Sequence, residues 1–277
     1  MTNDYPLATW RLVLESHPKD GALNMATDEA LLREVAAHRS PPTLRLYTWS
    51  PPAMTLGRGQ PFADADVAAL SAHGITLLRR GTGGTAVLHE DELSYTVAVT
   101  DDEPRLAGGV VESYRGLSAA LLYALEKIGL HNAEASAHAE NRRPRSPNEE
   151  RSPVCFELPS DYEITVDQRK LFGSAQMRIR GGVLQHGTLP LSGDIARISA
   201  YLTAHPPAKR IRTHAITLRD ALGHDIAWRD VADALVEGFT ATLNLTFNPA
   251  PLLPAERRLI DQLIAEKYTN PAWTNRI

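Results

Sequence analysis

Cys155 is the only cysteine among the 277 residues, and Lys170 follows it at the head of the run Lys170-Leu171-Phe172-Gly173-Ser174-Ala175-Gln176. A thiol beside an ammonium has a lowered pKa and a larger thiolate fraction, which is what a nucleophilic cysteine needs. A lone cysteine is more often a small buried hydrophobe, and a lone lysine is more often a solvated surface charge. The two residues are therefore candidates for catalysis only in combination with other motifs.

The segments around these two residues predict an antiparallel meander. Residues 161–167 (DYEITVD) alternate polar and apolar side chains, as a strand with one buried face does. A second extended run leads from Lys170 to residues 181–182, and a third, residues 183–191, carries Gln185, His186 and Gly187. Such a meander would bring Cys155 beside Lys170.

A glycine-rich stretch upstream is the second motif with chemical potential. Directly after a predicted strand at residues 75–78, the sequence reads Arg79, Arg80, Gly81, Thr82, Gly83 and Gly84. Glycines let the backbone turn sharply and offer bare amides to an oxygen of a ligand, and the arginines add charge-assisted donors. The stretch has neither the ending of a P-loop nor the glycine spacing of a dinucleotide site. A glycine-rich hairpin with surface arginines is the alternative interpretation.

Composition and charge exclude several classes of protein. Hydrophobic residues make up 43% and charged residues 22%, as in ordinary globular proteins. The net charge of −4 indicates no nucleic-acid partner and no anionic membrane surface. One cysteine allows neither an intrachain disulfide nor a cysteine-based zinc site, and we expect no metal. The N-terminus lacks signal-peptide features and no apolar run is long enough to span a membrane, so we expect a cytoplasmic protein.

The order of predicted elements indicates a strand-rich domain with several helices. Strands are predicted at residues 9–14, 43–49, 53–58, 75–78, 86–88 and 93–99, and helices at 21–38, 64–73, 110–128, 193–201, 228–243 and 254–268. Asp64 suits the N-cap or first turn of its helix, and the pair Asp28-Glu29 indicates a solvated helix face. Residues 138–152 are polar and charge-dense, which predicts a mobile surface loop.

Taken together, these motifs resemble the biotin/lipoate protein ligase family, which includes the octanoyl transferases of lipoic acid biosynthesis. The matching stretches are NMATDEALL, PTLRLYTWSPPAMTLGRGQ, LLRRGTGGTAVLHEDELSYTV, CFELPSDYEITVDQRKLFGSAQMRIRGGVLQHGTLPL and EKYTNPAW. The resemblance extends from near residue 20 to the end of the sequence. It implies a mixed α/β (α+β) fold in a single domain, residues 1–277, with a central, largely antiparallel sheet flanked by helices and a catalytic core at approximately residues 38–250.

Within that family the sequence looks like the octanoyl transferases of Gram-positive type. Lipoate ligases need no cysteine nucleophile and usually carry an additional C-terminal domain, whereas this sequence stops nine residues after Tyr268 and has a cysteine before the PS-Y-E segment. The resemblance implies that Cys155 forms an acyl thioester. It also implies that Lys170 assists, by favouring the thiolate and holding the acyl carbonyl as negative charge develops there.

The expected substrate-binding residues come from both motifs. They are Arg79, Arg80, Gly81, Thr82, Gly83, Gly84, His89, Gly173, Ser174, Ala175, Gln185 and His186. Backbone amides near the glycine pairs are candidates for an oxyanion site or for the wall of an acyl slot. For His89 and His186 a structural role such as capping a turn is favoured over proton relay, and a histidine base for Cys155 stays open.

The reaction that the resemblance implies moves octanoyl from acyl carrier protein to a lysine of a lipoyl-domain protein, such as the glycine cleavage H protein or an E2 subunit. It runs in two steps through a thioester on Cys155, so neither ATP nor a cofactor is expected. One alternative is an ATP-dependent lipoate–protein ligase that lacks or borrows its accessory domain. Another is a non-catalytic protein that binds lipoyl domains, and a third is a thioester-forming hydrolase.

Overall fold

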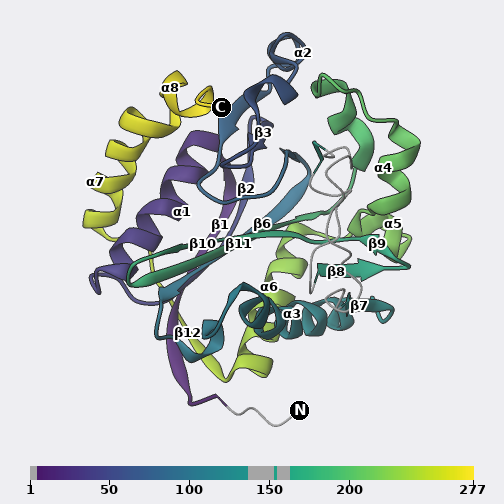
Figure 1. The fold of residues 1–277 in the computed structure, drawn as a ribbon. Helices are drawn as coiled ribbons and strands as arrows, with labels where there is room; N and C mark the ends of the chain where they lie inside the picture. Colours follow the sequence, from purple (N-terminus) through teal and green to yellow (C-terminus); the bar gives the residue numbers. More distant parts are fainter. Residues whose placement is uncertain (1–4, 137–152, 155–162) are drawn as a thin grey trace.

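The computed structural model describes residues 5–136, 153–154 and 163–277 (Figure 1). In chain order the strands and α-helices are β1 (Ala8–Lys19), α1 (Gly21–Ala36), β2 (Thr43–Trp49), β3 (Ala53–Leu56), α2 (Val67–Ala72), β4 (Thr76–Arg79), β5 (Val87–His89), β6 (Glu92–Thr100), α3 (Val110–Lys127), β7 (Ala133–Ser136), β8 (Glu163–Val166), β9 (Arg169–Lys170), β10 (Gly173–Ile179), β11 (Gly182–Pro190), α4 (Ala208–His214), α5 (Leu218–Leu222), α6 (Trp228–Leu243), β12 (Leu245–Pro249), α7 (Pro254–Leu263) and α8 (Pro271–Thr274).

Six strands form the central sheet, in the order β10-β11-β6-β2-β1-β12. The three pairings from β10 to β2 are antiparallel, and the two pairings that β1 makes are parallel. Helices cover both faces of this sheet: α1 with α7 lies on one, and α3 with α6 lies on the other (Figure 1). The predicted α/β fold with a largely antiparallel sheet flanked by helices is confirmed.

The sheet separates two interiors because side chains of a strand alternate between its faces. On β2, Leu44 and Leu46 enter the main apolar core beneath α3 and α6. Tyr47 and Trp49 point to the opposite face and pack against alanines of α1. Each fully buried apolar side chain stabilises the fold by about 1.5–3 kcal/mol, and the cluster on the α3–α6 face is larger than the one under α1.

Small residues let α1 lie close to the sheet. The helix begins at its N-cap Asp20, whose carboxylate accepts a hydrogen bond from the backbone N–H of Leu23 at 3.0 Å. At its other end it meets the first residue of β11, where a Cβ on Gly182 would lie 2.8 Å from the Cβ of Ala36. This close contact fixes α1 over β6 and β11, with its buried side chains directed at the sheet.

Two three-stranded sheets complete the fold, in the orders β4-β3-β5 and β7-β8-β9. The predicted single meander around Lys170 is therefore wrong: β8 and β9 belong to a small sheet, whereas β10 and β11 belong to the central one. The chain changes sheet at Leu171 and Phe172, whose backbone N–H groups both donate to the carbonyl of Ile164. The predicted mobile loop, residues 138–152, lies outside the described residues.

The predicted start of one helix is also wrong. Asp64 ends a short 3₁₀ turn (Phe62–Asp64), and Asp66 caps α2 instead by accepting from the N–H of Ala69 at 2.9 Å. The last predicted helix keeps its bounds, residues 254–268, but it is α-helical only as far as Leu263 and continues as a π-helix (Ile264–Tyr268).

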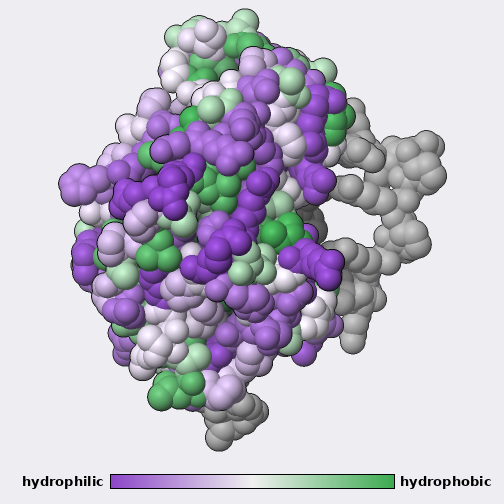
Figure 2. Space-filling model, turned by 90° about the vertical axis from the view of Figure 1, so that its left-hand side faces the viewer, coloured by the Kyte–Doolittle hydropathy of each residue, from purple (hydrophilic) through white to green (hydrophobic). Residues whose placement is uncertain are grey.

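The described part of the chain contains no helix that is both long and apolar enough to cross a membrane. On the face drawn in Figure 2, hydrophilic side chains dominate and hydrophobic ones form small separate patches. Patches of that kind are ordinary on protein surfaces and mark no particular partner.

Candidate active site

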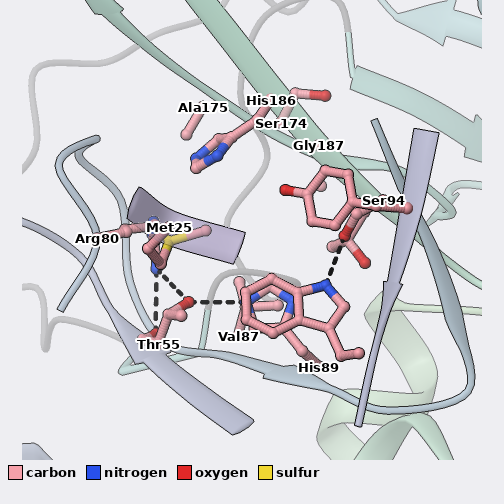
Figure 3. A pocket seen from close by; sticks show the side chains of 14 residues that line it. Met25, Thr55, Arg80, Val87, His89, Ser94, Ser174, Ala175, His186 and Gly187 are labelled. Atoms are coloured by element: carbon pink, nitrogen blue, oxygen red, sulfur yellow. Dashed lines mark hydrogen bonds between the residues drawn. The ribbon is translucent and has the colours of Figure 1, made fainter. Parts of the chain in front are cut away.

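A cavity that opens to solvent lies on the α1 face of the central sheet, between that sheet and the strands β3 and β5 (Figure 3); its empty volume, including the open part, is about 380 Å³. Much of its wall is apolar and comes from Met25, Trp49, Val87 and Ala175. A second cavity of about 200 Å³ shares Met25 and His186 with the first. An apolar cavity with a few convergent polar groups is the usual form of a small-molecule site.

Gly187 lets its part of the wall of the larger cavity pack closely against Tyr95 and Ser174. A Cβ at this position would lie 2.5 Å from the Tyr95 ring and 2.7 Å from the Ser174 hydroxyl oxygen. Ser174 and Gly187 face each other across the β10–β11 pair, so this part of the wall is backbone and small side chains.

His186 is the centre of a hydrogen-bonded relay that reaches both cavities. Its Nδ1 lies 3.1 Å from Oδ2 of Asp28, and its Nε2 lies 2.8 Å from Oγ1 of Thr82. Arg80 Nε donates to the same Thr82 oxygen at 3.1 Å. Because a carboxylate only accepts, Nδ1 carries the proton, and the Thr82 hydroxyl donates to Nε2.

Asp28 is held as an anion at the inner end of this relay. Burial raises the pKa of its carboxyl, but the hydrogen bond from His186 and the charge of Arg45 outweigh it, so that the pKa lies below its ordinary value. Arg45 contacts Asp28 Oδ1 at 2.7 Å and Tyr47 donates to Oδ2 at 3.0 Å. Burial and the charge of Asp28 raise the pKa of Tyr47 well above its ordinary value, so Tyr47 remains a donor.

The predicted solvated face at Asp28-Glu29 is wrong, since only 3% and 5% of these residues are exposed. Glu29 accepts hydrogen bonds from both Lys267 and Tyr268, at 2.6 Å each. Burial raises the pKa of Glu29, but these two bonds lower it below its ordinary value. Sequence reasoning missed this cluster, although both the helix and the final KY pair lie in the motifs that carry the family resemblance.

His89 forms a second relay of the same chemical composition. Its Nδ1 lies 2.9 Å from Oε1 of Glu92, and its Nε2 lies 2.9 Å from Oγ1 of Thr55. Arg80 also donates to Thr55, at 3.2 Å (Figure 3), and because it donates to Thr82 as well, it joins the two relays. The His89 ring stacks on Trp49 with centroids 3.9 Å apart. Both histidines bond to other side chains rather than to the backbone of a turn, and the favoured structural role stays a prediction for both.

The two arginines of the glycine-rich motif have different surroundings. Arg79 points away from the cavity and donates to the carbonyls of Gly57, Gln60 and Thr274 at 2.6–2.9 Å. Arg80 lines the cavity, but it also donates to loop carbonyls, including that of Gly83 at 2.7 Å. Arg79 is thus a predicted substrate-binding residue that the structure places elsewhere.

The glycines of the same motif are divided between the cavity and the surface. Gly81 and Thr82 line the smaller cavity. Gly83 and Gly84 are exposed at the tip of the loop and are not part of either cavity wall described above. Arg80 therefore determines the shape of a loop of which only the first half faces the site.

Strand alternation also divides the predicted residues of β10 and β11. Gly173, Ser174 and Ala175 line the larger cavity. Gln185 points to the opposite face from His186 and donates to the hydroxyl of Tyr95 at 3.0 Å. β10 is the edge strand of the central sheet, so its outward backbone groups are not used by that sheet.

Lys170 is buried, with 4% of the residue exposed, and its ammonium forms an ion pair with Glu163 of the neighbouring strand. The interpretation of Lys170 as a solvated charge is therefore wrong. Cys155 lies outside the described residues, so its predicted proximity to Lys170 stays a prediction. The preceding residue, Val154, forms a parallel bridge with Ala86, at the foot of β5.

Solved structures with this fold define the class of protein. A lipoate-protein ligase A bound with ATP is 25% identical with a TM-score of 0.78, and the alignment covers 97% of this chain and 99% of that one. A bi-partite lipoate protein ligase from Thermoplasma acidophilum is 23% identical with a TM-score of 0.79 and 98% coverage of both chains. The fold is that of a lipoate protein ligase.

The chain belongs to the lipoyl protein ligase A/B catalytic domain family, whose model matches residues 20–240. Octanoyltransferase LipM of Kyrpidia tusciae is 40% identical to it, over 98% of this chain and 100% of the relative. Octanoyltransferase LipM of Moorella thermoacetica is 38% identical, over 98% and 99%. The family resemblance that the motifs predicted is confirmed.

Proposed function

We propose that this protein is an octanoyltransferase of lipoate biosynthesis. The observation that carries this proposal is its identity of 40% and 38% to two octanoyltransferases along the full length of both chains. The apolar cavity of about 380 Å³, with polar relays at its edge, suits an acyl chain that ends in a reactive carbonyl.

The acyl donor in this proposal is octanoyl-acyl carrier protein, and the acceptor of the first step is Cys155. The cysteine thiolate attacks the donor thioester, a new C–S bond forms, and the carrier protein leaves as a thiol. Lys170 favours the thiolate and offers its ammonium to the acyl carbonyl. The burial of Lys170 and its ion pair with Glu163 support a role inside the protein rather than at its surface.

The final acceptor in this proposal is a lysine of a lipoyl domain, in the glycine cleavage H protein or an E2 subunit, and we place the reaction in the cytoplasm. An archaeal relative of this fold has been studied together with its E2 lipoyl domain, which supports this class of partner. Transfer from a thioester to an amine is downhill, so the reaction proceeds without ATP.

The test is to incubate the purified protein with octanoyl-acyl carrier protein, without ATP, and to record its intact mass. We expect one octanoyl adduct that hydroxylamine removes and that Cys155→Ala does not form. If modification appears only with free acid and ATP, the protein is a ligase and the proposal is wrong.

A further inference from the structure

We propose that Met25 closes one end of the larger cavity and thereby limits the length of the acyl chain that the enzyme accepts. The inference rests on the proposed function, in which this cavity takes the acyl chain and Lys170 offers its ammonium to the acyl carbonyl. Met25 and His186 are the two residues that the walls of the larger and the smaller cavity have in common. These two side chains therefore form the partition between the two spaces.

The two parts of this partition are held in different ways. Hydrogen bonds fix both ring nitrogens of His186, to Asp28 at 3.1 Å and to Thr82 at 2.8 Å. Met25 is 3% exposed and belongs to the apolar cluster under α1. A methionine side chain is unbranched and adapts its shape to fill an irregular gap. Met25 is thus the part of the partition that a substitution can remove without breaking a hydrogen bond.

The strand register shows which end of the larger cavity is nearer Lys170. Thr188 pairs with Gly173 on one side and with Ser94 on the other, and all three line the cavity. Lys170 precedes Gly173 by three residues, so their Cα atoms are at most about 11 Å apart. An acyl carbonyl held by Lys170 therefore lies toward the Thr188 end.

Met25 lies at the opposite end of the same cavity. His186 is two positions before Thr188 on β11, a distance of about 7 Å along the strand. Figure 3 shows Met25 and His186 on the side of the cavity that lies away from Ser94. An acyl chain whose carbonyl points toward Lys170 therefore directs its methyl end at Met25.

The space behind Met25 is suited to additional methylene groups. Leu184 and Met177 contribute apolar side chains to the wall of the smaller cavity. The two carboxylates in the same wall are already paired, with Arg45 at 2.7 Å and with Lys267 at 2.6 Å. Burial of a charge is unfavourable chiefly when it is unpaired. A longer chain can therefore enter this space once the Met25 side chain is shortened.

The experiment measures chain-length preference in the full-length protein. An equal mixture of hexanoyl-, octanoyl-, decanoyl- and dodecanoyl-acyl carrier protein is added without ATP, and the acyl-enzymes that form at early times are counted by intact mass. The quantity compared is the ratio of decanoyl to octanoyl adduct. Because both adducts form in one sample, this ratio does not depend on how much of a variant is folded.

Four variants separate the end wall from general loosening of the core. Met25→Ala removes the partition, whereas Met25→Leu conserves its volume. Met177→Ala enlarges only the smaller cavity. Met54→Ala is the matched control, because Met54 is completely buried in the apolar cluster around β3 and β5 and is part of neither cavity wall.

For Met25→Ala we expect the ratio of decanoyl to octanoyl adduct to rise by about 10-fold or more, since one methylene in a fitted apolar pocket changes selectivity by about 10- to 200-fold. The ratio should stay at the wild-type value in Met25→Leu, Met177→Ala and Met54→Ala. Combining Met25→Ala with Met177→Ala should admit the dodecanoyl chain as well.

An unchanged ratio in Met25→Ala would overturn the inference, because the chain then ends short of Met25 or points the other way. An equal rise in Met54→Ala would also overturn it, and so would a rise in Met177→Ala alone. If Met25→Ala does not fold, Met25→Val is judged by the same ratio. A wild-type protein that forms none of the four adducts refutes the proposed function itself, and this result is obtained before any variant is made.

Discussion

Adjacent residues of β2 show how differently the two faces of the central sheet are built. Leu46 enters an apolar core beneath α3 and α6, in which aliphatic and aromatic side chains pack against one another. Arg45 points the other way, is completely buried, and forms ion pairs with Asp28 and Glu15. One face of the sheet is thus held by apolar packing, whereas the other also depends on buried ion pairs that position the site.

Among the variants that test this difference between the two faces, Arg45→Met should have the largest effect on the free energy of unfolding. Removing one partner of a buried ion pair leaves an uncompensated charge and costs about 3–5 kcal/mol, here because Asp28 loses its cation. We expect the free energy of unfolding, measured in urea, to fall by that amount, together with the rate of octanoyl transfer. Adding Asp28→Asn should recover part of the stability; no recovery would contradict this account.

Leu46→Ala tests the opposite face at the next position. Loss of a buried leucine side chain costs about 2–5 kcal/mol, through lost burial and the cavity left behind, and Leu46 is completely buried. We expect the urea midpoint to fall while activity per folded molecule is retained. A loss of activity in a fully folded sample would show that the two faces are not independent.

The pH dependence of the unfolding free energy should reveal the lowered pKa of Asp28. Its folded pKa is lower than the ordinary value of 3.8, so the folded state binds fewer protons and the carboxylate stabilises the fold above that value. This stabilisation should be lost as the pH falls from about 3.8 through the folded pKa. The measurement is the difference in unfolding free energy between wild type and Asp28→Asn across this range, which should shrink as the pH falls.

The smallest effect should come from Arg33→Ala, at the solvent-facing edge of the same cluster. The Arg33 side chain is 47% exposed and pairs with Glu29 one helical turn away. Such pairs contribute about 0.5 kcal/mol or less and are screened by salt. We expect a decrease of that size in low salt and none in high salt, whereas a large decrease would mean that Lys267 and Tyr268 do not hold Glu29 on their own.

The sequence predicted regular elements well where one periodicity was unbroken. The strand at residues 43–49 and the helix at residues 228–243 match β2 and α6 residue for residue, because alternation and an amphipathic stripe mark their limits. The prediction failed between β9 and β10, where the chain passes from the small sheet to the central one. Each of these segments has an ordinary strand pattern, so only its long-range pairing shows which sheet it joins.

The sequence predicted only part of the site, again because contacts between distant residues leave no local pattern. The family motifs led to Arg80, His89 and His186, all of which line the cavity. Asp28 was missed because its partner His186 is 158 residues away, and local sequence carries no sign of that contact. The division between His186 and Gln185 follows from strand alternation and was available from the sequence once β11 was recognised.

The pairing of β1 with β12 has a consequence for how the protein is made. Ala8 is in register with Leu245, so the outer edge of β1 stays uncovered during synthesis until β12 has been made. Contacts that span so much of the chain slow folding, and an uncovered strand edge invites association with other chains. Nascent chains that end before residue 245 should therefore depend on chaperones.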